Sequence, residues 1–391
     1  MNFSTAVLLI RILKSVLTNK NDDFLDSMNM DFVHLYAFAK AHHLAGFVAL
    51  CPEILKQMPP ELAKKFIYEN HRAVAREATQ EVVISSFLDK MEEAGLRAMP
   101  LKGFYVKNFY PNPALRYMTD TDILIDEADI EKITPIMKSL GFEFNHETLH
   151  EIIFRSNQLV VELHKCLVHD LRTTLYDYYK DGWSFGKLQE GKNFIYKMSP
   201  EDTYVYTVTH LAKHYLEGGI GILHVADIYV LSRSEINREY VENELSKLGL
   251  IDFVKKVRSL AMLWFSDKMP ETDSSVLEMA DFILKSGAYG NDTNRTAAGA
   301  FLQEERLGKK QSNLVRIIKR TFVSPTHIKM LYPVVKKHRY LYPVFILVRI
   351  WDVLFKRKDT KQKLINMAST TDTEKDTLKK HFEKMGLPTD L

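Results

Sequence analysis

The spacing of apolar residues changes twice along this chain, near residue 95 and near residue 199, and this constrains the fold more than any other feature. Before residue 95, apolar side chains recur at helical spacing, as Ile84, Phe87, Leu88 and Met91 do at i, i+3, i+4 and i+7. Residues 96–165 carry short apolar runs separated by turns, and helical spacing returns after them. We therefore expect an α+β fold, with a small sheet between N-terminal and C-terminal helical regions.

Local signals place the boundaries of these regions. Gly95 can end a helix, and Ser199-Pro200 can start one, because serine caps a helix and proline suits its first turn. A chain of 391 residues exceeds the usual size of one hydrophobic core. We predict an N-terminal helical region at 1–95, an α/β core at 96–198, a helical lobe at 199–286, and a linker with a C-terminal basic helical region at 287–391.

Within the core, strands are predicted at 97–101, 117–125, 142–144 and 159–164. A helix between them has the apolar face Ile130, Ile133, Met137 and Leu140, and Gly141 ends it. Residues 287–313 are polar and glycine-rich, which predicts a linker or mobile loop.

The composition excludes several classes of protein. A hydrophobic share of 46% and a charged share of 26% are those of a globular chain, which argues against wholesale disorder and against many membrane spans. The net charge of +3 gives no strong nucleic-acid signal. Cys51 and Cys166 cannot form a disulfide framework, so we expect a reducing compartment, the cytoplasm by default.

No transmembrane segment is expected. The apolar stretch 6–10 is interrupted by Arg11 and Lys14, and the stretch 344–355 contains Arg349 and Asp352. The basic and aromatic segment 329–357 is most simply a packed helix with snorkelling lysines. Docking of an acceptor and weak association with a membrane surface are the alternatives.

Two aspartates open the second predicted strand. Side chains alternate along a strand, so Asp120 and Asp122 point to the same face and their carboxylates converge. Oxygen ligands of this kind suit Mg²⁺, which keeps further positions for water and phosphate oxygens. Alone, the pattern fits a solvated acidic turn equally well.

A third carboxylate lies in the otherwise apolar strand at 159–164. Glu162 and His164 share one face of that strand, and a carboxylate there needs a partner. If the two strands are neighbours, Glu162 completes a cluster with Asp120 and Asp122 that can hold two divalent ions roughly 3.5 to 4 Å apart. The alternative is a salt-bridged strand glutamate.

A polar stripe marks the helix that follows Ser199. His210, Lys213, His214 and Glu217 recur at i, i+3, i+4 and i+7, opposite an apolar stripe. The stripe is either solvated or faces a ligand. Zinc binding by His210 and His214 is disfavoured, because the sequence places no third ligand near them.

These residues occur in an order that resembles the successive motifs of the uncharacterised nucleotidyltransferase family, within the polymerase-β-like superfamily. The matching segments are Leu101-Lys102-Gly103, Tyr110-Pro111, Arg116, Asp120 to Ile125, Gly141-Phe142 and Glu162-Leu163-His164, with Gly221 and Asp227 in the next motif. The likeness is clearest over residues 96–230. It implies a mixed sheet, dependence on Mg²⁺ (two ions, with Mn²⁺ as a substitute) and a nucleoside triphosphate as donor.

The resemblance also implies roles for individual residues. Asp120, Asp122 and Glu162 would be the catalytic metal ligands, with Glu162 as a possible base, and His210, Lys213 and His214 would contact the nucleotide. The superfamily usually has Gly-Ser where this chain has Lys102-Gly103. Gly103 still permits close backbone approach to phosphate and Lys102 adds charge, although an ordinary turn beside a surface lysine is the alternative.

Arg116 has two interpretations. An arginine just before the acidic strand can clamp a phosphate bidentately, or it can pair with a neighbouring acid. The sequence alone does not separate the two.

The leading hypothesis is a metal-dependent transfer of a nucleoside monophosphate from the triphosphate to an acceptor hydroxyl or phosphate, with release of pyrophosphate. The acceptor is an unknown small molecule, peptide or protein. The competing hypothesis is a non-catalytic nucleotide-binding module, a sensor or scaffold in a biosynthetic or defence complex. The position of Glu162 separates them, because only a catalyst needs it beside Asp120 and Asp122. Since converging carboxylates repel, Asp122→Asn is expected to keep the fold and to stabilise it by ~1 kcal/mol.

Overall fold

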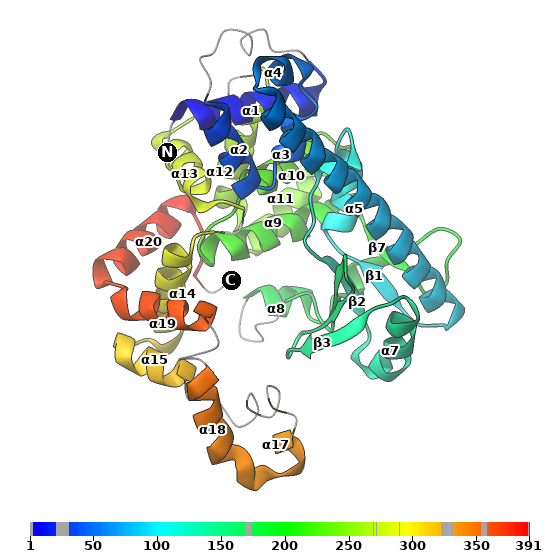
Figure 1. Cartoon of the computed structure of the whole chain (residues 1–391), viewed down its shortest axis with the longest axis vertical. Helices are drawn as coiled ribbons and strands as arrows, with labels where there is room; N and C mark the ends of the chain where they lie inside the picture. Colours follow the sequence, from blue (N-terminus) through cyan, green and yellow to red (C-terminus); the bar gives the residue numbers. More distant parts are fainter. Residues whose placement is uncertain are drawn as a thin grey trace.

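A computed structural model of the chain describes residues 3–20, 31–168, 174–268, 270, 272–288, 290–321, 328, 332, 334–352, 358–389 and 391. A five-stranded sheet and a two-stranded sheet lie among many helices, which confirms the predicted α+β class (Figure 1). Among the described residues no helix is long and apolar enough to cross a membrane.

The larger sheet is mixed and has the strand order β1-β2-β5-β4-β3. Strands β2 and β5 run parallel, and the other neighbouring pairs are antiparallel. The strands span Ala98–Pro100 (β1), Thr121–Ile125 (β2), Glu143–Glu147 (β3), Glu151–Arg155 (β4) and Val160–His164 (β5), and the small sheet pairs Gly186–Leu188 (β6) with Tyr196–Met198 (β7). Asp122 is in register with Glu162, so the two acidic strands are neighbours, as the cluster requires.

The two faces of this sheet have different partners. Ile123, Ile125, Val161 and Leu163 form one hydrophobic core with residues of α5 (Pro60–Glu93) and α7 (Ile130–Ser139). The alternate positions of β2 and β5, which include both acids, point to the other side. Alternation along the strands thus separates a buried face from the face that carries the polar residues.

Helices precede and follow the sheet along the chain. The N-terminal helices are α1 (Phe3–Thr18), α2 (Phe32–Ala41), α3 (Ala45–Val48), α4 (Pro52–Gln57) and α5. The short α6 (Gly103–Val106) follows β1, and α8 (Thr174–Tyr179) precedes the small sheet. Next come α9 (Pro200–Leu216), α10 (Ile222–Ser232), α11 (Arg238–Lys247), α12 (Ile251–Phe265) and α13 (Ser274–Ser286).

Helix α9 starts where the sequence predicts. The Ser199 side chain accepts a hydrogen bond from the Asp202 amide at 3.0 Å, and Pro200 occupies the first turn. The glycines predicted to end α5 and α7, Gly95 and Gly141, have φ of +68° and +81°. Left-handed backbone of this kind is accessible to glycine and stops a helix.

The predicted strand 117–125 is too long at its start. The strand begins at Thr121, because the carbonyl oxygens of Met118 and Thr119 accept hydrogen bonds from the Arg76 guanidinium, at 2.9 and 2.8 Å. Asp120 therefore lies in an irregular segment directly before β2. A side chain on α5, distant in sequence, decides where the strand begins.

The predicted linker at 287–313 is wrong for most of its length. Residues Asp292–Leu307 form helix α14, which the Asn291 side chain caps by accepting from the Asn294 amide at 2.7 Å. Its buried face is made largely of alanines, which gives a weak apolar signal in the sequence. Ala297, Ala298, Ala300 and Phe301 are buried there.

The remaining C-terminal elements are helical where the structure describes them. They are α15 (Asn313–Thr321), α17 (Val334–Lys337), the 3-10 turn η6 (Arg339–Leu341), α18 (Tyr342–Trp351), α19 (Lys358–Ser369) and α20 (Asp372–Met385). Helix α20 packs against α14, with the ion pairs Lys375 to Glu304 and Lys379 to Glu305 at 2.8 and 2.7 Å. Helices α17 and α18 form the lower end of the molecule (Figure 1).

Candidate active site

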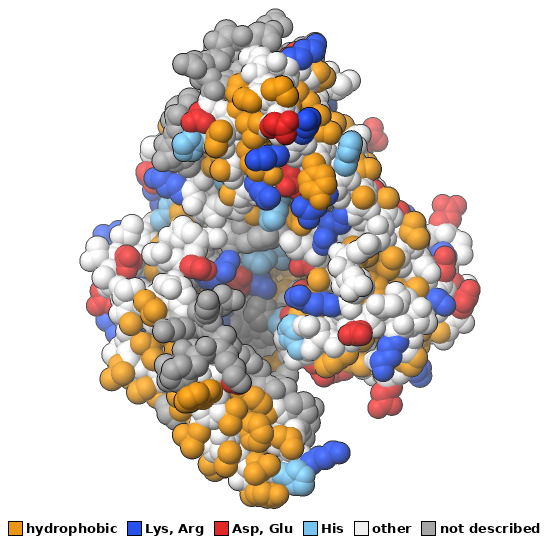
Figure 2. All heavy atoms as spheres, in the orientation of Figure 1, with side chains coloured by type: hydrophobic (Ala, Val, Ile, Leu, Met, Phe, Trp, Pro, Cys, Tyr) orange, Lys and Arg blue, Asp and Glu red, His pale blue; other side chains and the backbone are white. Residues whose placement is uncertain are grey.

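The polar face of the sheet borders a cavity of about 360 Å³. Its other walls come from α9, α10 and the end of α2, so helices from three parts of the chain close it. Figure 2 shows a hollow on this side of the molecule with basic and histidine side chains along its edge. Every residue that the sequence assigns to the site lines this cavity: Lys102, Gly103, Arg116, Asp120, Asp122, Glu162, His210, Lys213 and His214.

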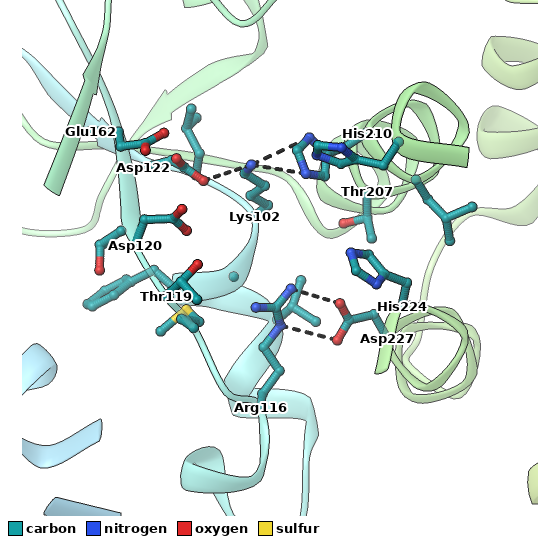
Figure 3. Close-up of a pocket in the computed structure, with 18 of the residues that line it drawn as sticks. Lys102, Arg116, Thr119, Asp120, Asp122, Glu162, Thr207, His210, His224 and Asp227 are labelled. Carbon is teal, nitrogen blue, oxygen red and sulfur yellow. Dashed lines mark hydrogen bonds and ion pairs between the residues drawn. The ribbon is translucent and has the colours of Figure 1, made fainter. Parts of the chain in front are cut away.

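The carboxylates of Asp120, Asp122 and Glu162 converge on this cavity from the side of β2 and β5 (Figure 3). Asp122 and Glu162 project from the same face because they are register partners on parallel strands. Each offers an oxygen that lies within 4.8 Å of the other and of a ring nitrogen of His164. Glu162 and Asp122 are therefore neighbours, as the sequence predicts.

These donors fit a divalent cation. Two carboxylates and one imidazole nitrogen within 4.8 Å can share one ion, and Asp120 adds a fourth donor group at the edge of the cluster. His164 differs from the predicted set, in which the third ligand was Asp120. The sequence pattern placed His164 on the correct face but gave it no role.

Electrostatics within the cluster also suit a cation. Burial and the neighbouring charges of Asp122 and Asp120 raise the pKa of Glu162 to about 8. Burial and the charge of Asp122 likewise raise the pKa of Asp120. Burial would raise the pKa of Asp122 too, but Lys102 and His164 outweigh it and hold this pKa well below its usual range. The cluster thus carries like charges that a bound cation would stabilise.

Lys102 is the internal counter-charge of Asp122. Its Nζ lies 2.8 Å from Asp122 Oδ2, while His164 Nε2 lies 3.0 Å from the other oxygen, Oδ1. The same Nζ lies 3.2 Å from His210 Nε2 (Figure 3). Lys102 has φ of +25°, a backbone conformation that costs a residue with a side chain about 1 to 3 kcal/mol. The strained turn holds this ammonium between the acids and α9.

Gly103 is closely packed against two side chains. A Cβ at this position would lie 2.7 Å from Met118 Sδ and 2.9 Å from Arg116 Nη1. The expected close approach therefore exists, and the groups that approach are protein side chains. A phosphate contact at this turn stays a prediction.

From the sequence, Arg116 is expected either to clamp a phosphate or to pair with a neighbouring acid. In the structure it pairs with an acid, Asp227. Its Nη2 donates to Asp227 Oδ2 at 2.8 Å and its Nε to Oδ1 at 3.2 Å. The Tyr110 hydroxyl also donates to Asp227 Oδ1, at 2.7 Å. Asp227 is 1% exposed, so this network fixes α10 to the segment before β2 from inside the protein.

Three residues of the polar stripe of α9, His210, Lys213 and His214, line the cavity, whereas Glu217 does not. The rings of His210 and His214 lie 4.2 Å apart, and that of His224 on α10 lies 6.5 Å from His214. Burial and the charge of Lys102 hold the pKa of His210 well below its ordinary value, and burial with His214 lowers that of His224 to about 3. Burial also lowers the pKa of Lys213. Within the described part of the chain, His210 and His214 belong to no cluster of three metal ligands.

Sequence reasoning missed two groups at this site. Glu151 on β4 is the register partner of His164 and adds a fourth carboxylate to the same face, where it lies 3.2 Å from His150. Its strand alternates polar and apolar residues weakly, so only sheet pairing reveals it. His42 and His43, at the end of α2, also line the cavity, and no local pattern distinguishes them from surface histidines.

Comparison with known proteins agrees with this geometry. A family described as uncharacterised nucleotidyltransferase matches residues 29–266, which is more than half of the chain and includes every candidate residue above. No curated protein and no solved structure matches. The matched range contains the mixed sheet, the acidic cluster and α9. The chain therefore belongs to the uncharacterised nucleotidyltransferase family.

Proposed function

We propose that this protein is a metal-dependent nucleotidyltransferase that moves a nucleoside monophosphate from a nucleoside triphosphate to an acceptor hydroxyl or phosphate. Family membership supports the general activity. The observation that carries the finer proposal is the register of Asp122 and Glu162, which brings both carboxylates to one side of the cavity. A module that only binds nucleotide would not need Glu162 there.

In this proposal Asp122, Glu162 and His164 hold a divalent ion, Mg²⁺ or Mn²⁺, and Asp120 helps to hold a second. Bound ions would neutralise charge on the triphosphate and the leaving pyrophosphate. Lys102 would leave its ion pair with Asp122 and bind a phosphate oxygen of the triphosphate, because its ammonium lies beside the cluster. His210, Lys213 and His214 would contact the nucleotide from α9.

The reaction is a displacement at phosphorus. The acceptor oxygen forms a bond to the α-phosphorus, the bond from that phosphorus to the bridging oxygen breaks, and pyrophosphate leaves with the electron pair. The acceptor proton passes to the Glu162 carboxylate, which a bound divalent ion would keep ionised and so able to accept it. Arg116, held by Asp227, would keep the segment before β2 in place.

Transfer of label tests the proposal. The full chain is incubated with Mg²⁺ or Mn²⁺ and each of the four α-labelled triphosphates, in the presence of metabolite or protein mixtures. We expect label in an acceptor and release of pyrophosphate, both lost in Asp122→Asn and kept in Asp126→Asn, an aspartate outside the cavity that pairs with Arg97. Triphosphate binding without either product would instead favour the nucleotide-binding module.

A further inference from the structure

The charge of the chain is concentrated in one C-terminal segment. Residues 313–358 contain eleven lysines and arginines and a single acidic residue, Asp352. The net charge of the whole chain is +3, so this segment carries +10 and the rest of the chain carries −7. Asp352 is itself engaged, because it accepts a hydrogen bond from the Tyr332 hydroxyl at 3.0 Å. The segment lies outside the range matched by the family.

Helix α18 turns its apolar face to solvent. Large apolar side chains recur at helical spacing on the outside of this helix and its preceding turn, while Arg349 is 7% exposed. Leu347 is 68% exposed and Trp351 is 59% exposed. The exposed stripe consists of Tyr340, Val344, Leu347, Val348 and Trp351.

Helix α15 shows the same inversion. Leu314, Val315 and Ile318 are exposed, and Arg316 is 4% exposed, with its guanidinium donating to Asn313 Oδ1 and the Thr296 carbonyl. Figure 2 shows the resulting hydrophobic surface at the lower end of the molecule, over α18. A packed helix with snorkelling lysines would bury its apolar residues and expose its charged ones. The prediction of such a helix is therefore wrong for α18.

The partner of this surface must be both apolar and negatively charged. A second copy of the same segment is disfavoured, because two segments of +10 repel one another. A nucleic acid would satisfy the charge but would leave the aliphatic stripe uncovered. An anionic bilayer offers phosphate groups to the basic residues and an acyl boundary to the stripe, and tryptophan and tyrosine favour that boundary.

We propose that α18 and the turn η6 before it bind the surface of an anionic lipid membrane. The stripe from Tyr340 to Trp351 enters the headgroup boundary, and Lys337 and Arg339 contact lipid phosphates. The enzyme then works beside a membrane without spanning it.

Flotation of the full chain with vesicles tests this. We expect binding to phosphatidylcholine vesicles that contain phosphatidylserine, weakening as salt increases, and little binding to phosphatidylcholine alone. Leu347→Glu should weaken binding about tenfold or more, since it removes a leucine that would be buried in the membrane in the bound state. Lys337→Gln should weaken it about fivefold. The matched control is Val82→Glu on α5, a position 70% exposed and far from this segment in sequence, which should bind as wild type does.

Trp351 supplies a second readout. Its emission should shift to shorter wavelength with anionic vesicles. The shift should be lost in Trp351→Phe, because Trp264 is buried in the core and Trp183 is partly buried under the Arg97 guanidinium. The proposal is overturned if anionic vesicles do not bind, or if Leu347→Glu binds them as wild type does. It is also overturned if sedimentation reveals a dimer that Leu347→Glu dissociates, or if duplex nucleic acid binds more tightly than vesicles do.

Discussion

Lys102 Nζ lies 2.8 Å from Asp122 Oδ2, so the carboxylate assigned to a divalent cation already has a cation from the chain itself. Under the proposed function, metal binding would compete with an ammonium on Lys102, two residues after the end of β1. In the proposed function, this one atom pair would affect the stability of the fold, the affinity for metal and the binding of nucleotide.

Replacing Lys102 should separate these effects. Lys102→Met removes the competitor and leaves the buried Asp122 without its ion pair, so we expect stability in chelator to fall by about 3 kcal/mol. The affinity for Mn²⁺ should rise, while that for triphosphate falls. Urea unfolding and Mn²⁺ titration measure the two. Lys107→Met is the control, because Lys107 is more deeply buried than Lys102 and pairs with Glu77 and Glu81 outside the cavity. This variant should lose stability and bind Mn²⁺ normally.

The pH dependence of stability should reveal Glu162. Its pKa is raised from 4.5 to about 8, so the folded chain holds this proton between those values when the unfolded chain has lost it. The contribution to stability is therefore full below pH 4.5 and is lost as the pH rises through 8. In chelator, Glu162→Gln should be more stable than wild type by about 1 kcal/mol at pH 9 and similar to it at pH 5.

Metal binding should also release the Glu162 proton. Calorimetry of Mn²⁺ binding near pH 7 in two buffers of different ionisation enthalpy should give a proton release that Glu162→Gln abolishes. Glu147→Gln, at a strand glutamate paired with Lys165, should leave both the stability profile and the proton release unchanged. A release that persists in Glu162→Gln would assign the raised pKa to another group.

The buried pair of Arg116 and Asp227 should contribute far more to stability than a similar pair at the surface. Asp227→Asn leaves a buried guanidinium without its carboxylate and should cost about 3 kcal/mol. Arg97 and Asp126 form a bidentate pair with both distances at 2.7 Å, but this pair is partly exposed, so Asp126→Asn should cost about 1 kcal/mol or less. Equal costs in urea unfolding would contradict the positioning role of Asp227.

His164 should be a metal ligand, and spin echo spectroscopy of bound Mn²⁺ can detect it. The prediction is a ¹⁴N coupling in wild type that disappears in His164→Gln and persists in His150→Gln, because only His164 belongs to the three-ligand cluster. Imidazole also favours Mn²⁺ over Mg²⁺, so His164→Gln should reduce that preference. Binding of Mn²⁺ without nitrogen coupling would restrict His164 to orienting Asp122.

Much of the fold could be predicted from local signals. The capped start of α9 at Ser199 and the glycine ends of α5 and α7 depend on short sequence patterns and were predicted correctly. The strand start at Thr121 depends on Arg76, and α14 is covered by a helix some seventy residues later. Long-range contacts of this kind leave no local pattern.

The candidate site divides in the same way. The face shared by Asp122 and Glu162 follows from strand alternation, once the strands are known to be neighbours. The ion pairs of Lys102 with Asp122 and of Arg116 with Asp227 join distant parts of the chain and could not be predicted without the tertiary structure. The structure also changes one expectation: because Asp122 is paired with Lys102 and His164, the substitution expected to relieve charge repulsion is Glu162→Gln, and Asp122→Asn should destabilise the fold.

Mn²⁺ binding to the acidic cluster tests the central claim most directly, with paramagnetic resonance measuring free Mn²⁺ in the presence and absence of a non-hydrolysable triphosphate. We predict binding that the triphosphate tightens, and a loss of affinity of about tenfold or more in both Asp122→Asn and Glu162→Gln, with Asp126→Asn unchanged. Affinity that is the same in wild type and in both cluster variants, or indifferent to triphosphate, would contradict a metal-dependent nucleotidyltransferase site on this face of the sheet.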